Sequence, residues 1–156
     1  MKLHIRPATL DDAECLFLWR NDEETRRNSI NTDPVERESH VGWLTRSLTN
    51  SARKLYIVEA DGIPAGTVRT DILNDGAYEL SWTVAPEARG KGIGKAMLVQ
   101  FKQEVLPEAR IVATIQDGNV ASEKIAQALG LAKAEPAEHP GFSVWRSTSD
   151  ASETGQ

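Results

Sequence analysis

The sequence predicts a single α/β (α+β) domain whose elements follow the order strand, two helices, three strands, helix, strand, helix and two strands. Three observations support this class. The chain has 156 residues, which suits one domain with its own hydrophobic core. Runs rich in β-branched residues alternate with segments of helical periodicity. Turn and cap residues separate these segments, and no linker or internal repeat interrupts them.

The first three elements are a strand and two helices. Residues 3–6 have the composition of a short strand. Thr9 and Asp12 then form a helix-capping pattern, and we expect this helix to run to about Asn21 or beyond. Residues 33–36, Asp-Pro-Val-Glu, predict the start of a second helix with proline at its first position. The apolar face of that helix consists of Val41, Leu44 and Leu48.

Three strands follow in the middle of the chain. Residues 54–60 and 65–72 predict a hairpin, because an Asp-Gly dipeptide between them favours a tight turn. The turn residues 74–76 lead into a third strand at residues 77–84.

A basic, glycine-rich loop follows the third strand and leads into a helix. The loop combines three alternate glycines with three cations: Gly90, Gly92, Gly94, Arg89, Lys91 and Lys95. Glycine lets the backbone turn tightly and approach a ligand closely. The first N–H groups of a helix are unpaired and carry the positive end of its dipole, so this segment predicts a phosphate or pyrophosphate site. We expect the helix to end at Pro107.

A strand and another helix come next. Residues 110–116 have the composition of a strand. Asn119 is then a good helix N-cap, Glu123 stands in the first turn, and Gly130 suits the residue just past the helix end.

The C-terminal part of the chain closes the domain. Residues 131–135 and 142–146 predict two final strands. We therefore assign residues 1–146 to the domain and expect the polar residues 147–156 to form a mobile tail.

Two common phosphate-binding motifs do not fit the glycine-rich loop. A P-loop has wider glycine spacing and a Ser or Thr after its lysine, whereas Ala96 follows Lys95 here, so nothing would hold Mg²⁺. A dinucleotide fingerprint needs a third glycine at the position of Lys95. The spacing that does fit is Arg-x-x-Gly-x-Gly, at Arg89, Gly92 and Gly94.

That spacing resembles the acetyl-CoA pyrophosphate loop of the GNAT N-acetyltransferase family. Residues 119–131 resemble the second cofactor-side helix of the same family, which starts at an Asn and ends in an apolar residue plus Gly. The resemblance covers roughly residues 3–145. It implies a mixed, mostly antiparallel sheet of about seven strands flanked by about four helices, with acetyl-CoA as co-substrate and no metal.

The resemblance also implies how acetyl-CoA binds. The strands at residues 77–84 and 110–116 would splay apart, and pantetheine would pair with the backbone near Val84. A backbone N–H in this region would stabilise the carbonyl oxygen as charge develops on it. The expected cofactor-binding residues are Val84, Arg89, Gly90, Lys91, Gly92, Ile93, Gly94, Lys95, Asn119 and Ser122.

Other roles are open to some of these residues. Asn119 can serve only as a helix cap, and Ser122 can be a solvated residue of the first turn. Arg89 and Lys91 can be ordinary surface charges, although their position beside three glycines favours a ligand role.

Acetyl transfer to an amine needs a neutral nitrogen, and the pKa of an ordinary alkylammonium is about 10.4, so a base helps. Glu79 is the expected base, because many family members carry a Glu at this strand position; it can instead pair with a cation such as Arg69. Many members place a tyrosine, the acid for the departing thiolate, where this chain has Ala126. Ser122, water or Tyr78 would then replace that acid, and we take Ser122 as the candidate.

In this family the acceptor pocket is shaped by the first two helices, their connection and the last strands. The expected substrate-binding residues are Trp19, Arg20, Asn21, Trp43 and Trp82. Tryptophans at helical spacing can equally belong to the core, and an arginine near a helix C-terminus is common at the surface. For His40 we favour a plain helix residue over a base.

Residues 19–21, 27–29 and 38–43 look like a subgroup linked to bacterial nucleotide-activated amino-sugar synthesis, whose members resemble the N-acetyltransferase of pseudaminic acid biosynthesis. The function predicted is acetyl transfer from acetyl-CoA to a primary amine by direct attack in a ternary complex, with a nucleotide-linked amino sugar as acceptor. Two other functions stay open. One is a ribosomal-protein-type Nα-acetyltransferase, and the other is a non-catalytic CoA-binding regulatory module.

Charge and composition limit the partners. The net charge of −5 argues against nucleic acid, and an acidic body with a local basic loop suits a polyanionic cofactor and a cationic acceptor. Cys15, the only cysteine, cannot form an internal disulfide, and no run resembles a signal peptide or a membrane span. We expect a cytoplasmic protein whose partner is a small-molecule amine, without nucleic acid, membrane or metal. Homodimer formation is left open.

Overall fold

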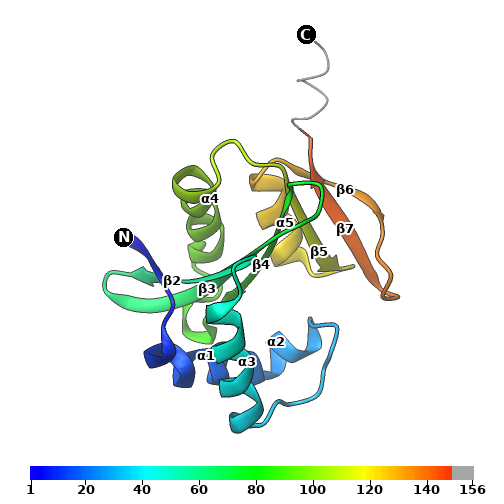
Figure 1. The fold of residues 1–156 in the computed structure, drawn as a ribbon. Helices are drawn as coiled ribbons and strands as arrows, with labels where there is room; N and C mark the ends of the chain where they lie inside the picture. Colours follow the sequence, from blue (N-terminus) through cyan, green and yellow to red (C-terminus); the bar gives the residue numbers. More distant parts are fainter. Residues whose placement is uncertain (149–156) are drawn as a thin grey trace.

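Seven strands form one sheet in the computed structural model, which describes residues 1–148 (Figure 1). The strands are β1 (Leu3–Pro7), β2 (Arg53–Ala60), β3 (Ile63–Ile72), β4 (Tyr78–Val84), β5 (Ile111–Gln116), β6 (Leu131–Pro136) and β7 (Phe142–Ser147). Their order across the sheet is β1-β2-β3-β4-β5-β7-β6. Every neighbouring pair is antiparallel except β4 and β5, so the predicted mixed, mostly antiparallel sheet is confirmed.

Five α-helices pack on the two faces of this sheet within the described part of the chain. They are α1 (Ala13–Asn21), α2 (Glu23–Arg27), α3 (Arg37–Thr49), α4 (Ile93–Val105) and α5 (Val120–Ala128). Figure 1 shows α4 and α5 on one side of the sheet and α1, α2 and α3 on the other. The sheet is therefore the middle of three layers, and β4 lies near its centre.

Two hydrophobic cores fix these layers. The first joins α4 and α5 to β2–β5, and its fully buried members include Phe101, Met97 and Leu80. The second joins α1 and α3 to β2, with Trp19 and Leu44 buried against the strand. Because side chains alternate along a strand, β4 turns one set of residues to each core. This places a polar face of β4 opposite the face that carries Leu80.

The predicted helix caps are confirmed at two places. The Thr9 hydroxyl accepts a hydrogen bond from the N–H of Asp11 at 3.2 Å, and the Asp12 carboxylate accepts one from the N–H of Thr9 at 2.9 Å. Asn119 caps α5, and Gly130 after it has a φ of +84°, which glycine adopts without strain. Asn119 therefore marks the start of α5, and Thr9 caps the 3₁₀ turn Leu10–Asp12 that leads into α1.

The predicted start of the second helix at residues 33–36 is wrong, because α3 begins at Arg37. The Asn21 side-chain amide binds both backbone groups of Val35: its Oδ1 accepts the N–H and its Nδ2 donates to the carbonyl, each at 2.8 Å. These bonds hold the preceding segment extended, and the first helical bond runs from the N–H of His40 to the carbonyl of Glu36. A tertiary contact thus overrides the local signal of proline.

Two further differences concern α2 and the C-terminus. We expected the first helix to run on beyond Asn21, but a separate short helix, α2, follows, capped by the Asp22 carboxylate, which accepts a bond from the N–H of Thr25 at 3.1 Å. Strand β7 includes Ser147. The expected mobile tail at residues 147–156 otherwise lies, from residue 149 onward, outside the described residues.

Candidate active site

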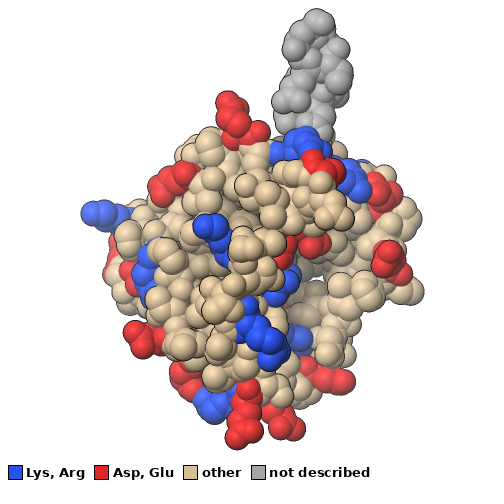
Figure 2. Space-filling view, viewed as in Figure 1, with Lys and Arg blue, Asp and Glu red and all other residues tan. Residues whose placement is uncertain are grey.

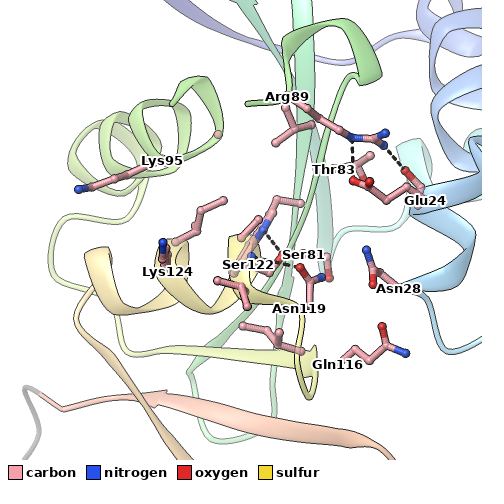
Figure 3. Close-up of a pocket in the computed structure, with 18 of the residues that line it drawn as sticks. Glu24, Asn28, Ser81, Thr83, Arg89, Lys95, Gln116, Asn119, Ser122 and Lys124 are labelled. Atoms are coloured by element: carbon pink, nitrogen blue, oxygen red, sulfur yellow. Dashed lines mark hydrogen bonds and ion pairs between the residues drawn. The ribbon is translucent and has the colours of Figure 1, made fainter. Parts of the chain in front are cut away.

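A cleft of about 770 Å³ opens where β4 and β5 separate (Figure 3). The parallel pairing of these strands stops after Glu79 and Val112. From there the strands diverge, and residues 80–84 and 114–116 line the cleft. Its other walls are the glycine-rich loop, the starts of α4 and α5, and α2. The two strands therefore splay as expected.

The free edge of β4 presents backbone donors to the cleft. The N–H of Tyr78 donates to the carbonyl of Arg110 on the β5 side at 2.9 Å, and the N–H of Ala85 donates to that of Ala65 on the β3 side at 2.7 Å. Because N–H groups alternate between the two sides of a strand, the N–H of Val84 faces the β5 side. In the described sheet β5 has diverged at this level, so this N–H can donate to a ligand that lies along β4.

The glycine-rich loop brings the start of α4 to the cleft. Gly90 and Gly92 have φ angles of +74° and +75°, in the region that favours glycine. A Cβ atom on Gly94 would lie 2.9 Å from Cγ2 of Val84, so the missing side chain lets the helix touch β4. The N–H groups of the first turn have no partner inside the helix, and Gly92, Gly94 and Lys95 line the cleft. The loop therefore has the form of an anion site.

Three basic side chains surround the cleft. Lys95 of α4 and Lys124 of α5 line it from one side (Figure 3). The guanidinium of Arg89 is turned toward α2, where its Nη2 lies 2.6 Å from the Asp22 carboxylate and its Nε lies 3.3 Å from that of Glu24. Figure 2 shows Lys and Arg side chains beside the hollow on this face of a protein whose net charge is negative. Lys95 and Lys124 therefore bring positive charge to the cleft, whereas the charge of Arg89 is balanced by Asp22 and Glu24.

The Arg89 side chain joins the glycine-rich loop to α2. Burial raises the pKa of Asp22, but hydrogen bonds from Arg89 and Thr25 outweigh that effect and hold the pKa below its usual value. Asp22 is therefore ionised at neutral pH, and the ion pair persists. Arg89 still lines the cleft, but its charge is balanced by the carboxylates of Asp22 and Glu24, whereas no described carboxylate forms an ion pair with Lys95.

Two of the expected cofactor-binding residues lie away from the cleft. Lys91 is exposed, and the side chain of Ile93 packs against the core formed by α1 and α3. Neither is among the described residues that line the cleft.

The start of α5 forms the opposite wall. The Oδ1 atom of Asn119 accepts a hydrogen bond from the N–H of Ser122 at 3.3 Å, and both side chains line the cleft. The indole Nε1 of Trp82 donates to the Ser122 hydroxyl at 3.2 Å. Because an indole N–H can only donate, the hydroxyl hydrogen of Ser122 is left to donate to another group. Ala126, at the position where the resemblance would place tyrosine, is fully buried in the core.

A second cavity, of about 340 Å³, lies between β4 and the helices α1 and α3. Ser81, Trp82 and Thr83 of β4 line both this cavity and the cleft. The two spaces therefore meet over the middle of β4.

Aromatic and aliphatic residues form about half of the wall of the second cavity. Trp19 and Trp43, two of the expected substrate-binding residues, line this cavity together. Trp82 also lines it, but its indole is on the face of β4 that carries Leu80 and bonds Ser122 of α5. The His40 ring sits 5.4 Å from the Trp43 ring and 5.8 Å from the Phe17 ring, measured between centroids. Trp19 also belongs to the core, so the two roles foreseen for it are not exclusive.

The polar groups of the second cavity are cationic or neutral. Arg20, Arg69 and His40 line it, and no described Asp or Glu does. The pKa of Arg20 is lowered by burial and, to a smaller extent, by the charge of Arg26. The pKa of His40 is lowered by burial and, to a smaller extent, by the charge of Arg20. His40 is only 6 % exposed, and its Nδ1 has no hydrogen-bond partner among the described residues. The expectation of a cationic acceptor finds no carboxylate here to support it.

Asn21, also expected to bind substrate, lies outside the lining of both spaces in the described chain. Its amide is fully used by the two bonds to Val35 described above. Because Val35 lines the second cavity, Asn21 shapes that cavity through the segment between α2 and α3.

Glu79, the expected base, lines neither space within residues 1–148. It stands opposite Asp71 on β3, and Arg69 pairs with Asp71 at 2.9 Å, so the alternative pairing of Glu79 with Arg69 is not formed. Glu79 does share its face of β4 with Ser81, two residues away, which is about 6.6 Å along a strand. Its role as a base stays a prediction and requires a bridging water.

Sequence reasoning missed several residues of the site. Lys124 lines the cleft from the same helix as Asn119 and Ser122. It comes five residues after Asn119, about 140° around the helix, so helical periodicity gave no signal for it. Asn28 and Glu24 of the α2 wall gave no signal, because a five-residue helix is too short for periodicity. Arg69 was noted only as a possible partner of Glu79.

Two searches of the described residues bear on other functions. None of the helices within residues 1–148 has the length and apolar character needed to cross a membrane. The same part of the chain brings together no group of three or more His, Cys, Asp or Glu side chains that could hold a metal ion.

Comparison with known sequences gives one family. The sequence model described as the acetyltransferase (GNAT) domain matches residues 2–132. Among curated proteins, no sequence matches this chain significantly.

Comparison with solved structures gives the same fold. Aminoglycoside acetyltransferase AAC(6')-Ib in complex with coenzyme A superposes with a TM-score of 0.77 at 17 % identity, over 99 % of this chain and 100 % of that one. The ribosomal-protein-alanine N-acetyltransferase of Brucella melitensis superposes with a TM-score of 0.72 at 23 % identity, over 92 % of this chain and 98 % of that one. An uncharacterised protein of Bacillus halodurans superposes with a TM-score of 0.83 at 16 % identity, over 97 % of this chain and 86 % of that one. At these identities the likeness shows the fold alone.

Proposed function

The chain belongs to the acetyltransferase (GNAT) domain family and is an acetyl-CoA-dependent N-acetyltransferase, and on this premise we propose that it acetylates the primary amine of a nucleotide-linked amino sugar. The observation that carries the proposal is the meeting of the two spaces over Ser81, Trp82 and Thr83. A thioester in the cleft and an amine in the second cavity come together there, as direct transfer requires.

Acetyl-CoA takes the cleft in this proposal. The N–H groups at the start of α4, with Gly90, Gly92 and Gly94 as the turn, hold the pyrophosphate. Lys95 and Lys124 supply positive charge for the phosphates. Pantetheine extends along the free edge of β4, so that its thioester reaches the level of Val84.

Transfer is direct, without an acyl-enzyme. Cys15 is the only cysteine, and burial, with smaller contributions from Asp12 and Glu87, raises the pKa of its thiol to about 11. A thiol with that pKa is a poor nucleophile at neutral pH, and Cys15 lines neither the cleft nor the second cavity. The amine nitrogen therefore attacks the thioester carbon itself, and the reaction needs both substrates bound together.

The groups around the reacting atoms have distinct tasks. The N–H of Val84 donates to the carbonyl oxygen, which gains negative charge as the nitrogen attacks. The C–S bond then breaks, and the Ser122 hydroxyl donates to the departing thiolate. The amine proton passes through water to Glu79. Asn119 orders the start of α5 and lies where it can also contact the pantetheine.

The choice of acceptor rests on size and chemistry. A cavity of about 340 Å³ lies at the lower end of the range of about 300–1,000 Å³ typical of small-molecule sites, which suits a sugar ring with its first phosphate. An extended peptide N-terminus remains the second candidate, since a ribosomal-protein-alanine N-acetyltransferase shares the fold. A non-catalytic CoA-binding module is the third.

Two-substrate kinetics test the proposal. We expect CoA release to require an amine, the acetylated amine to appear in equal amount, and double-reciprocal plots to intersect. A UDP-linked amino sugar should be turned over with a higher kcat/KM than an alanine-initiated peptide. Parallel double-reciprocal plots would contradict direct transfer. A higher kcat/KM for the peptide than for the sugar would favour the peptide acceptor. Binding of acetyl-CoA without turnover of any amine would favour the non-catalytic module.

A further inference from the structure

We infer that the acceptor carries an anionic group beside its amine, and that Arg20 binds this group in the second cavity. The inference rests on the proposed function, because it describes the molecule that occupies the acceptor side. The cavity holds two arginines and a histidine, and no carboxylate of the described chain lines it. A ligand with an oxyanion, either carboxylate or phosphate, supplies the missing charge.

Arg20 is poised for such a ligand. It lies at the end of α1, and its Nη2 donates to the carbonyl of Asn31 at 3.0 Å. Its Nη1 is buried and has no hydrogen-bond partner, and no carboxylate in residues 1–148 forms an ion pair with it. A buried N–H group without an acceptor is unfavourable, so an anion that accepts from Nη1 relieves that state.

His40 provides a second unsatisfied group in the same wall. Its side chain is more than nine-tenths buried, and its Nδ1 has no partner within the described chain. Burial and the nearby charge of Arg20 lower its pKa, so the ring is neutral at pH 7. A neutral imidazole can donate one hydrogen bond to an anion or accept one from a hydroxyl, whereas the charge itself comes from Arg20.

Arg69, on the β-sheet side of the cavity, already has a carboxylate partner, so Arg20 is the arginine that is left for a ligand. Arg69 pairs with Asp71 at 2.9 Å, and Asp71 also pairs with Arg53 at 2.6 Å. Arg53 and Arg69 share the carboxylate of Asp71, and Glu79 stands opposite Asp71 on β4, so two carboxylates lie beside these two arginines. The Nη2 atom of Arg69 also lies 3.4 Å from the hydroxyl of Ser81, which lines both the cavity and the cleft.

The charge of Arg20 also acts on the amine. Nearby positive charge disfavours the ammonium form, so the cavity lowers the amine pKa and eases the loss of the proton before attack. The anionic group on the acceptor offsets the repulsion that a bare cation would meet. A polycation such as an aminoglycoside lacks that compensation, although an aminoglycoside acetyltransferase has the same fold.

Calorimetry on the full chain saturated with CoA tests the inference with matched pairs of amines. One pair is D-glucosamine 6-phosphate and D-glucosamine, which tests phosphate; the other is alanine and alaninamide, which tests carboxylate. We expect one charged member to bind roughly 10-fold or more tighter than its neutral partner, the scale of one charge-assisted hydrogen bond. Kanamycin should bind more weakly than the preferred amine.

Variants decide whether Arg20 makes the preference. Arg20→Gln should abolish the difference between charged and neutral partners, and Arg20→Lys should keep part of it. Arg26→Gln is the matched control: Arg26 holds the same segment through the carbonyl of Thr32 at 3.2 Å but does not line the cavity, so the preference should survive.

The outcomes separate this inference from the proposed function. The inference would be overturned if both members of each pair bound equally or if kanamycin bound more tightly than the preferred amine. It would also be overturned if the preference survived Arg20→Gln, or if Arg26→Gln lost it to the same extent. Acetyl transfer to any amine, followed in parallel by mass spectrometry, tests the proposed function. A preference for anionic amines without transfer would overturn the function alone, and transfer without the preference would overturn the inference alone.

Discussion

The cleft and the second cavity are built from different parts of the polypeptide. The cleft takes its ligand-binding groups mainly from the backbone: the free edge of β4, the first N–H groups of α4 and the turns at Gly90 and Gly92. The second cavity takes its groups from residues that are spread over α1, α3, β2, β3 and β4. A fixed cofactor suits the first design, and a selected acceptor suits the second.

The two regions also differ in how their charges are balanced. Arg89 of the glycine-rich loop is paired with Asp22 and Glu24, so it ties the loop to α2. Arg20 of the second cavity has no such pair within the described chain. The contrast indicates that charge near the cleft partly serves structure, whereas the charge of Arg20 in the second cavity is left for a ligand.

The largest effect should follow from disturbing the backbone half of this comparison. Gly92→Val forces a β-branched residue into a positive φ at the start of α4 and crowds the anion site. Acetyl-CoA affinity should fall by about 100-fold or more, since hydrogen bonds to charged groups contribute about 1.5–3 kcal/mol each. Calorimetry measures this change.

Gly62→Val is the control for backbone strain. Gly62 has a φ of +83°, has open space around it like Gly92, and lies in the turn between β2 and β3. The Gly62→Val variant should lose about as much stability in urea unfolding as Gly92→Val, but it should keep its affinity for acetyl-CoA. Equal affinity losses in the two variants would remove the loop from the cofactor site.

The next largest effect concerns the base. If Glu79 takes the amine proton through water, Glu79→Gln should lower kcat by roughly 10²-fold, the usual scale for loss of a general base. The defect should shrink as pH rises, because the amine then loses its proton in solution. The pH–rate profile measures this, with the exposed Glu108→Gln as control. A small effect that is the same at every pH would exclude Glu79 and leave the cationic cavity to lower the amine pKa.

A smaller effect separates the two roles of Asn119. Asn119→Ser keeps an oxygen for the helix end, so the free energy of unfolding should change by well under about 1 kcal/mol, whereas Asn119→Ala should lose about that amount. If Asn119 also contacts pantetheine, acetyl-CoA affinity should fall in both variants. Unchanged affinity in the serine variant would leave only the cap.

The smallest effect is a pH dependence of stability from the second cavity. Burial, and then the charge of Arg20, lowers the pKa of His40 below the ordinary value of 6.5. The unfolded chain therefore binds a proton at a pH where the folded protein does not, and stability falls as pH drops below about 6.5. His40→Gln should lose less stability than the wild type between pH 7 and 5, as measured by urea unfolding. The exposed His139→Gln should follow the wild type; identical slopes in all three would contradict the buried, neutral state of His40.

The same contrast explains what could be predicted from the sequence. The cleft was found because its features are contiguous: strand, alternate glycines and helix start follow one another within residues 77–96, and Asn119 marks its own helix. Caps and turns are local, so Thr9 and Asn119 also matched the structure.

The second cavity could be predicted only in part. Trp19 and Trp43 were placed in it, but nothing local distinguishes Arg20, which lines it, from Asn21 beside it, which instead binds Val35. Those bonds also explain why α3 starts at Arg37 and not at the proline at residue 34. Glu79 was chosen by strand position, and only the register of β4 shows that it lies beyond the junction of the two spaces. Contacts between distant segments decide each of these points.

A crystal structure of the protein with acetyl-CoA tests the central claim most directly, because the claim is that cofactor and acceptor meet over β4. The account predicts the pyrophosphate on the N–H groups at the start of α4 and the thioester carbonyl on the N–H of Val84. The acetyl group should then face the opening to the second cavity at Ser81 and Thr83. Acetyl-CoA bound elsewhere, or an acetyl group pointing away from that opening, would contradict the account.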